Sequence, residues 1–394
     1  MFTSVPEFQP VYHDLAKAFL VFSGSNYRAV VAFCRVLDAR GLDIHIVART
    51  QQDLIFRTRY RRNVVAIRAL DRLDFADLDR CILEARLKTG VSEFILGPTS
   101  EFLNLFLLEN SQFFASRGCT IPLVDLNLYR RVSNKHSFSR ICQSKDVSIP
   151  REVFIEASPH FPFVAKPRYN ITTGKRSLYP YLINGMEDLA FFRQSENTAD
   201  YYFEEFVAGP SYYLLYYLSR DGEVTAWSQQ NLVQQPDGKS IVLAQVAQIH
   251  HDSVSAKFVE ILQDLGFWGL VMIEVIQRDG EYVFIELNPR FWGPFQLLIN
   301  SGSLVIDRFI NEQMNRQPSP SPSSVRLDAS YMWLGGIAQS MASGRQLTWH
   351  IDPPRHRTFF ITRHLHSDVY LRRDTARLFF HEMKEAVCTW LSSL

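Results

Sequence analysis

The chain reads Phe284-Ile285-Glu286-Leu287-Asn288-Pro289-Arg290 near its three-quarter point, which places an acid, an amide and a cation at alternate positions of one apolar run. A similar run, 270–276, precedes it and contains Glu274. The segment Arg278-Asp279-Gly280 between the two runs is typical of a hairpin turn. We therefore expect an antiparallel strand pair in which Glu274 and Glu286 lie nearly opposite each other, with Asn288 on the same face.

This face carries three hard oxygen donors, and the two carboxylates should repel each other unless a cation lies between them. Carboxylate and amide oxygens suit Mg²⁺ shared with phosphate groups. Arg290 continues the alternation, and its planar guanidinium can bind phosphate oxygens. The alternative, a solvated hairpin face, fits poorly because the acids interrupt runs that otherwise look buried.

A second signal lies upstream, where Lys166 ends the apolar run 161–165. A lysine in such a place is costly unless it is paired, and a nucleotide phosphate is a natural partner. The polar loop Tyr169–Ser177 follows and could cover a triphosphate with its hydroxyls, amides and cations. The segment 202–210 then has the form of a strand leading into a Gly-Pro turn, which can present backbone donors and acceptors to an adenine edge.

Taken in order, these segments resemble the ATP-grasp superfamily, carboxylate–amine ligase type, over residues 15–305. The resemblance implies that Glu274, Glu286 and Asn288 are magnesium ligands. It implies catalytic roles for Arg290 and Lys166: Arg290 steadies the transferred phosphoryl group or the acyl intermediate, and Lys166, like Lys135, holds the phosphates. It further implies an ATP site made by Lys135, Lys166, Glu204, Glu205, Phe206, Val207, Ser211 and Arg290.

Two positions depart from the family pattern. Residues 204–207 resemble the hinge segment that holds adenine between two lobes. Many relatives carry an acid for the ribose hydroxyls in the turn after this hinge, whereas this chain has Ser211 there. The loop Tyr169–Ser177 contains only one glycine, fewer than is usual for a loop that covers phosphates.

The expected fold class is α/β: an ATP-grasp fold with an N-terminal parallel α/β domain, a small lid and a larger α+β lobe. The N-terminal pattern is an apolar run at 15–22, a helical segment at 27–39 and strands at 43–48 and 93–96, which indicates a parallel sheet. An apolar helix is predicted at 102–114. The predicted divisions are 1–128 for the N-terminal domain, 129–206 for a connector helix (127–142) and lid, 207–316 for the lobe with the metal site, and 317–394 for a Pro/Ser linker and C-terminal appendage.

In the appendage we expect a strand at 358–361 and an amphipathic helix at 375–391, in a unit that completes the lobe or forms a dimer contact. Aromatic residues near the site mostly fit core packing, as with Tyr213 and Phe295. A further hypothesis is that Trp292 and Arg168 border the substrate pocket, because they lie close in sequence to Arg290 and Lys166.

Composition agrees with an enzyme that acts on small molecules. The chain has 394 residues, 46% of them hydrophobic, and its net charge of +1 argues against a nucleic-acid partner. No signal peptide or membrane span is indicated, so we expect a cytoplasmic protein without membrane contact. The five cysteines are scattered, which favours reduced thiols. The histidine pairs 250–251 and 364/366 lack nearby cysteines or acids in register, so we do not expect a metal there.

These parts predict an ATP-dependent ligase that activates a carboxylate as an acyl phosphate and joins it to an amine, giving ADP and phosphate. The expected cofactors are ATP and two Mg²⁺ ions, for which Mn²⁺ could substitute. The expected substrates are amino acids or small peptides, and a homodimer is a candidate assembly. Four alternatives stay open: a carboxylase that uses bicarbonate, a ligase with a thiol or hydroxyl acceptor, an ATP-binding module without turnover, and, more distantly, an NAD-dependent oxidoreductase.

Overall fold

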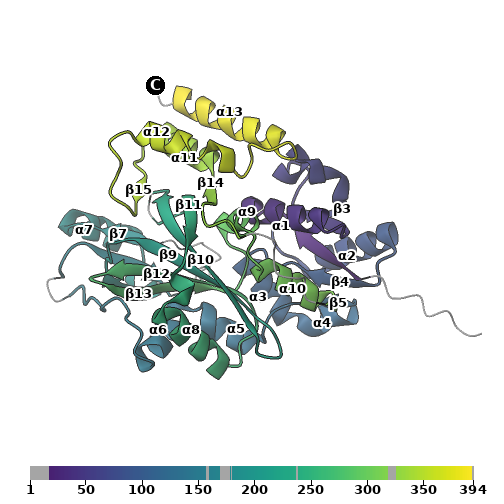
Figure 1. Cartoon of the computed structure of the whole chain (residues 1–394), viewed down its shortest axis with the longest axis horizontal. Helices are drawn as coiled ribbons and strands as arrows, with labels where there is room; N and C mark the ends of the chain where they lie inside the picture. The colour runs from purple at the N-terminus through teal and green to yellow at the C-terminus, as the bar shows by residue number, and fades with distance from the viewer. Residues whose placement is uncertain are drawn as a thin grey trace, which may run out of the picture.

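The computed structural model describes residues 17–156, 159–168, 178, 180–236, 238–317 and 325–392. Its strands form three sheets, and helices pack around them (Figure 1). The predicted polar loop 169–177 and the Pro/Ser segment 318–324 lie outside the described residues.

The N-terminal sheet has five parallel strands in the order β3-β2-β1-β4-β5. Side chains of its central strand alternate between two cores: Phe19 and Val21 face α1, whereas Leu20 and Phe22 face α2 and α3. The parallel α/β prediction for this region is confirmed. Its elements are β1 (Lys17–Phe22), α1 (Tyr27–Ala39), β2 (Ile44–Ala48), η1 (Leu54–Arg57), η2 (Arg59–Asn63), β3 (Val64–Ile67), α2 (Phe75–Thr89), β4 (Glu93–Leu96), α3 (Glu101–Glu109), α4 (Ser111–Ser116) and β5 (Cys119–Thr120).

Two antiparallel sheets follow along the chain. A small sheet, β7-β6-β8, is made of β6 (Phe163–Pro167), β7 (Tyr181–Ile183) and β8 (Tyr201–Glu205), with α7 (Met186–Ser195) and η3 (Thr198–Asp200) between β7 and β8. A seven-stranded sheet has the order β13-β12-β9-β10-β11-β14, and β15 pairs with β10. Its elements are β9 (Ser211–Leu218), β10 (Val224–Gln234), β11 (Ile241–Ala247), η4 (Ile249–His251), α8 (Ser253–Asp264), β12 (Gly269–Arg278), β13 (Glu281–Asn288), η5 (Gly293–Phe295), α9 (Gln296–Ser301), α10 (Val305–Gln313), β14 (Ser330–Met332), α11 (Leu334–Ala342), β15 (Thr348–Trp349), α12 (Arg357–Thr362), η6 (Leu365–Ser367) and α13 (Ala376–Ser392).

Two long predicted helices are each broken by an asparagine. The segment 102–114 forms α3 and α4, which meet at Asn110. The connector 127–142 forms α5 (Leu126–Ser133) and α6 (Lys135–Ser144), which meet at Asn134. Asn134 has extended backbone angles, and its side chain accepts a hydrogen bond from the Ser137 amide, so it ends one helix and caps the next. The break makes Lys135 the first residue of α6.

The C-terminal segment completes the large lobe, as the sequence suggested, because β14 pairs with β11 and β15 pairs with β10. The predicted strand at 358–361 is wrong, since these residues lie in α12. Phe360, Ile361 and Leu365 pack against a small apolar cluster while Phe359 is exposed, a spacing that suits one helical face. Tertiary packing therefore overrides the strand preference of β-branched and aromatic residues.

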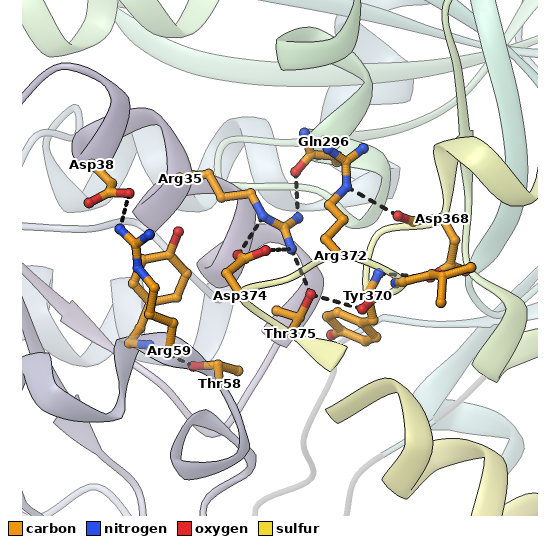
Figure 2. Close-up of polar contacts among 12 residues, drawn as sticks. Arg35, Asp38, Thr58, Arg59, Gln296, Asp368, Tyr370, Arg372, Asp374 and Thr375 are labelled. Atoms are coloured by element: carbon orange, nitrogen blue, oxygen red, sulfur yellow. Dashed lines mark hydrogen bonds and ion pairs between the residues drawn. The ribbon is translucent and has the colours of Figure 1, made fainter. Parts of the chain in front are cut away.

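Polar contacts fasten this C-terminal segment to the N-terminal domain (Figure 2). The Arg35 guanidinium on α1 donates to both carboxylate oxygens of Asp374, at 2.8 and 3.2 Å, to Thr375 Oγ1 at 2.9 Å and to Gln296 Oε1 on α9 at 2.7 Å. The Arg59 amide adds a bond to the Asp374 carbonyl oxygen at 2.7 Å. One arginine thus joins three segments that are distant in sequence.

The main core also crosses between domains. Phe19 and Phe33 from the N-terminal domain share one buried cluster with Phe291 and Phe309 from the lobe. The Phe33 and Phe291 ring centroids are 4.8 Å apart. No helix in the described part of the chain is both long and apolar enough to cross a bilayer.

Burial of Glu382 gives the stability of the fold a predicted pH dependence. Glu382 on α13 accepts a hydrogen bond from Trp333 Nε1 at 2.9 Å and is 8% exposed. Its burial, with a smaller contribution from Asp368, raises the pKa of its carboxyl to about 7 against the weaker opposing effects of Trp333 and Arg28. The folded state therefore keeps a proton that the unfolded state releases above about pH 4.3, so stability is lost as pH rises from about 4.3 to about 7.

We expect Glu382→Gln to remove this loss, because an amide oxygen can still accept from Trp333 but no ionisation is needed. Urea unfolding at pH 5 and pH 8 measures the free energy of unfolding of both proteins. Between these two pH values the difference in that free energy between variant and wild type should shift by about 1–3 kcal/mol in favour of the variant. Glu385→Gln, at an exposed site on the same helix, is the matched control and should change little. Parallel pH curves for wild type and Glu382→Gln would contradict the assignment.

Candidate functional site

The predicted hairpin of β12 and β13 is confirmed, and Glu274 pairs directly with Glu286. A one-residue bulge produces this register, because Val275 pairs with Phe284 while Glu274 pairs with Glu286, leaving Ile285 as the extra residue. Without the bulge, Glu274 would face Ile285 and Glu286 would point to the other side of the sheet. The bulge therefore brings the two carboxylates onto one face.

Positive and polar groups surround these acids. Glu286 Oε2 lies 2.8 Å from Lys135 Nζ, and Glu286 Oε1 accepts from Asn288 Nδ2 at 2.8 Å. Asn288 Oδ1 in turn accepts from Arg290 at 3.1 Å. Lys135 and Arg290 thus bring positive charge from this chain beside Glu286.

The two carboxyls differ in their pKa values. Burial, and next the neighbouring charge of Glu286, raise the pKa of Glu274 above its usual range. Burial also acts to raise the pKa of Glu286, but the charge and hydrogen bond of Lys135, with help from Arg290 and Asn288, outweigh burial and lower it. Close placement of two acids with pKa values moved in opposite directions is typical of functional sites.

Lys166 reaches the same place from the small sheet. Its ammonium forms an ion pair with Glu204 and donates to the Ile285 carbonyl oxygen at 3.4 Å. Ile285 is the bulge residue, so the distortion that positions Glu286 also gives its carbonyl to the lysine. The side chains of Lys166 and Glu204 are each 9% exposed, which makes this a buried ion pair between neighbouring strands of the small sheet, whereas the bond to Ile285 crosses to the large sheet.

The hinge segment, residues 204–207, begins with the last two residues of β8. Glu205 accepts from Arg151 Nε at 2.8 Å and forms an ion pair with Arg278 at 2.8 Å, so its carboxylate ties the hinge to its neighbours. Phe206 is 40% exposed and Val207 is buried. Gly209 has φ of +147°, and a Cβ there would lie 2.1 Å from the Gln277 carbonyl oxygen, so the hinge can pass this close to β12 only with glycine.

A cavity of about 300 Å³ lies between α6 and β8. Tyr202 and Glu204 of β8 and His136 of α6, the residue after Lys135, contribute to its wall. The cavity therefore adjoins both Glu204 and the start of the helix that carries Lys135.

Three predicted contact residues have partners that the sequence did not indicate. Ser211, which stands where many relatives carry the acid for ribose, is fully buried and its hydroxyl donates to Glu274 Oε1 at 2.9 Å. Trp292, assigned to the substrate pocket, is 1% exposed and packs with Phe295 at a ring distance of 5.2 Å. Arg168 is exposed at the end of β6, and its Nε donates to the Tyr201 carbonyl oxygen at 3.1 Å.

The other aromatic and histidine signals fall mainly in the core. Tyr213 and Phe295 are buried, as the packing interpretation predicted. His250 stacks on Trp227, its Nδ1 lies 2.8 Å from Ser228 Oγ, and burial lowers the pKa of its imidazole to about 4. Within the described ranges, no group of three or more His, Cys, Asp and Glu side chains is arranged to hold a metal.

Sequence reasoning missed Asn231 and Gln229 of β10. Both are fully buried, and Asn231 Nδ2 donates to Ser211 Oγ at 2.8 Å. The sequence signal for them was a run of four polar residues, Ser228–Asn231, between the apolar pairs 226–227 and 232–233.

No family model matches the sequence, and no curated protein matches it. Solved structures do match. The biotin carboxylase domain of Hydrogenobacter thermophilus 2-oxoglutarate carboxylase has 14% identity over 80% of this chain and 73% of that chain, with a TM-score of 0.58. That domain is described as a dimer in complex with MgADP, ADP and bicarbonate.

Two further structures are similar. Biotin carboxylase from Campylobacter jejuni has 15% identity over 79% of this chain and 74% of that chain, with a TM-score of 0.58. N5-carboxyaminoimidazole ribonucleotide synthetase from Thermus thermophilus has 14% identity over 77% of this chain and 80% of that chain, with a TM-score of 0.55. At these identities the similarity establishes a shared fold.

The buried pair between Lys166 and Glu204 yields a stability prediction. Glu204→Ala should destabilise the protein by about 3–5 kcal/mol, because it leaves the lysine charge buried without its partner. Urea unfolding measures the change. Arg151→Ala removes a partner of Glu205 that is 83% exposed and should cost less than about 1 kcal/mol. Equal costs for the two variants would contradict the difference in burial.

Proposed function

We propose that this chain, which has the ATP-grasp fold, is an ATP-dependent ligase that activates a carboxylate as an acyl phosphate and joins it to an amine. The products would be ADP, phosphate and an amide or peptide bond. The observation that carries the proposal is the convergence of Glu274, Glu286 and Asn288 with three cations on one face of the large sheet.

The donors in this group suit magnesium. Glu274, Glu286 and Asn288 supply oxygen atoms from one hairpin, and hard oxygen ligands with few protein donors are what Mg²⁺ uses when it also binds phosphates. These three residues would hold the metal, with Mn²⁺ as a substitute and a second Mg²⁺ as a further part of the proposal. When bound, the metal supplies charge neutralisation for the phosphates.

The chain's own cations would do the remaining electrostatic work. Lys135 forms an ion pair with Glu286, and Lys166 forms one with Glu204. A bound triphosphate would offer each lysine negatively charged oxygens near the position of its present carboxylate partner. Arg290 would stabilise charge on the acyl phosphate and on the tetrahedral species formed when the amine attacks. No protein nucleophile is needed, since the phosphoryl group itself supplies the leaving group.

The hinge would hold the adenine. Residues 204–207 link the small and large sheets, and their backbone would supply the donors and acceptors for the base. Because Glu205 is engaged with Arg151 and Arg278, its side chain would fix the hinge and leave recognition of the base to the backbone. Arg168 and Trp292 stay proposed as residues that border the substrate.

The amine acceptor and amino-acid or peptide substrates form the finer part of the proposal. Bicarbonate as substrate is the second candidate, favoured by a similar structure that holds bicarbonate. A thiol or hydroxyl acceptor would use the same phosphate chemistry. We also propose a homodimer and a cytoplasmic location, and we keep the domain limits of 128, 206 and 316 as a proposal.

Glu286→Gln tests the metal and phosphate site. The variant should lose Mg²⁺-dependent ADP formation by about 10–100-fold or more, because an amide keeps the shape but not the charge. ADP release is measured by a coupled assay, and circular dichroism checks the fold. Glu281→Gln, at the exposed start of the same strand, is the control. Wild-type turnover in Glu286→Gln would remove this site from consideration.

Substrate class is tested by phosphate release from ATP and Mg²⁺ with amino acids and other carboxylates, alone and in pairs, followed by mass spectrometry. We expect release that needs two organic substrates and a product with the condensed mass. Release with bicarbonate and one amine would instead favour the carboxylase, and a thioester or ester product would change the acceptor class.

A further inference from the structure

A buried row of polar side chains runs from the candidate metal site into the large sheet. Gln229 Nε2 donates to Asn231 Oδ1 at 2.8 Å, Asn231 Nδ2 donates to Ser211 Oγ at 2.8 Å, and Ser211 Oγ donates to Glu274 Oε1 at 2.9 Å. These side chains come from β10, β9 and β12, which are neighbours in the sheet. The row therefore connects a carboxylate at one strand to an amide two strands away.

All three bonds point in the same direction. As a metal ligand Glu274 would be ionised, and an ionised carboxylate can only accept, so Ser211 gives its proton to Glu274. The serine oxygen can then accept from the amide of Asn231, whose carbonyl is left to accept from Gln229. Reversing Asn231 would make Ser211 donate to it and would leave Glu274 Oε1 without this donor. The carboxylate thus sets the orientation of the whole row.

The row is expensive for the fold. Ser211, Asn231 and Gln229 have no exposed surface, and Gln229 Oε1 has no hydrogen-bond partner among the described residues. An unsatisfied buried polar group costs about 1–3 kcal/mol, whereas apolar side chains of similar shape would fill the interior of a sheet without that cost. The gain lies at the other end, where a hydrogen bond to a charged group is worth about 1.5–3 kcal/mol.

We infer that Ser211, Asn231 and Gln229 are positioning residues that orient Glu274 as a metal ligand. The inference rests on the proposed function, because it assigns these residues to the metal of that site. Ser211 holds Oε1, which would leave Oε2 of Glu274 as the oxygen available to the cation. Partners of this kind orient a ligand and raise metal affinity.

This assignment competes directly with a ribose contact by Ser211, the residue that stands where many relatives carry the acid for ribose. A ribose contact needs the hydroxyl at the nucleotide surface, whereas the Ser211 hydroxyl lies in the sheet between Asn231 and Glu274. The two roles predict different effects of removing the hydroxyl. A positioning role predicts weaker metal binding, whereas a ribose contact predicts weaker nucleotide binding.

The test measures Mn²⁺ binding to the full chain by electron paramagnetic resonance in the presence of a non-hydrolysable ATP analogue, without turnover. Ser211→Ala should raise the Kd for Mn²⁺ by about 10-fold or more. Ser211→Thr keeps the hydroxyl and should stay near wild type. Asn231→Asp should also weaken binding, because the new carboxylate removes the amide donor and competes for the serine proton. Gln229→Met, at the far end, should have the smallest effect.

Tyr212→Phe is the matched control. Tyr212 neighbours Ser211 on β9, but its side chain lies on the opposite face of the strand, against the apolar cluster that contains Leu214 and Tyr216. Unchanged Mn²⁺ affinity in folded Ser211→Ala would overturn the inference. The inference would also be overturned if Ser211→Ala bound nucleotide less tightly without metal and no longer distinguished ATP from 3′-deoxy-ATP. That result would assign the Ser211 hydroxyl to the ribose. If the wild type itself bound no Mn²⁺ with the analogue, the proposed function would fail. If the wild type bound Mn²⁺ and the Kd of the Ser211→Ala variant were unchanged, only the inference about Ser211 would fail.

Discussion

Two carboxylates face each other across one strand pair, and much of the structure around them answers that constraint. Like charges at directly opposed positions destabilise a sheet, and burial adds to the cost. The chain brings in cations from separate elements: Lys135 from the start of α6, Lys166 from the small sheet and Arg290 from the end of β13. The connector, the small sheet and the lobe therefore converge at the place where negative charge is concentrated.

The N-terminal domain is held against this lobe from two sides. A shared aromatic cluster that includes Phe33 and Phe291 packs α1 against the residues that follow Arg290. Arg35, on the same helix as Phe33, binds Asp374 and Gln296. This one arginine of α1 thus binds both α9 and the C-terminal segment. The backbone that carries Arg290 is consequently fixed by packing and by hydrogen bonds.

Several features followed from local pattern alone. Alternation of apolar and polar residues predicted β12 and β13, and Asp279-Gly280 predicted their turn. The run ending at Lys166 and the helix at 27–39 were equally clear. Other features required contacts between distant residues. The helix at 357–362 has strand-like composition, and packing decides it because the local preference is weak there. The break at Asn134 is local instead, since this asparagine caps the helix that follows, but the apolar pattern continues across it and hides it from a periodicity argument.

The sequence by itself determined which residue types gather at the candidate site, because periodicity of two places Glu286, Asn288 and Arg290 on one face of any strand. Only the tertiary structure decided the register that sets Glu274 opposite Glu286, since a bulge at Ile285 is a property of the pair and not of either strand. The same holds for Ser211. Its hydroxyl could serve a ribose or a carboxylate, and the choice of Glu274 depends on the neighbouring strands β10 and β12.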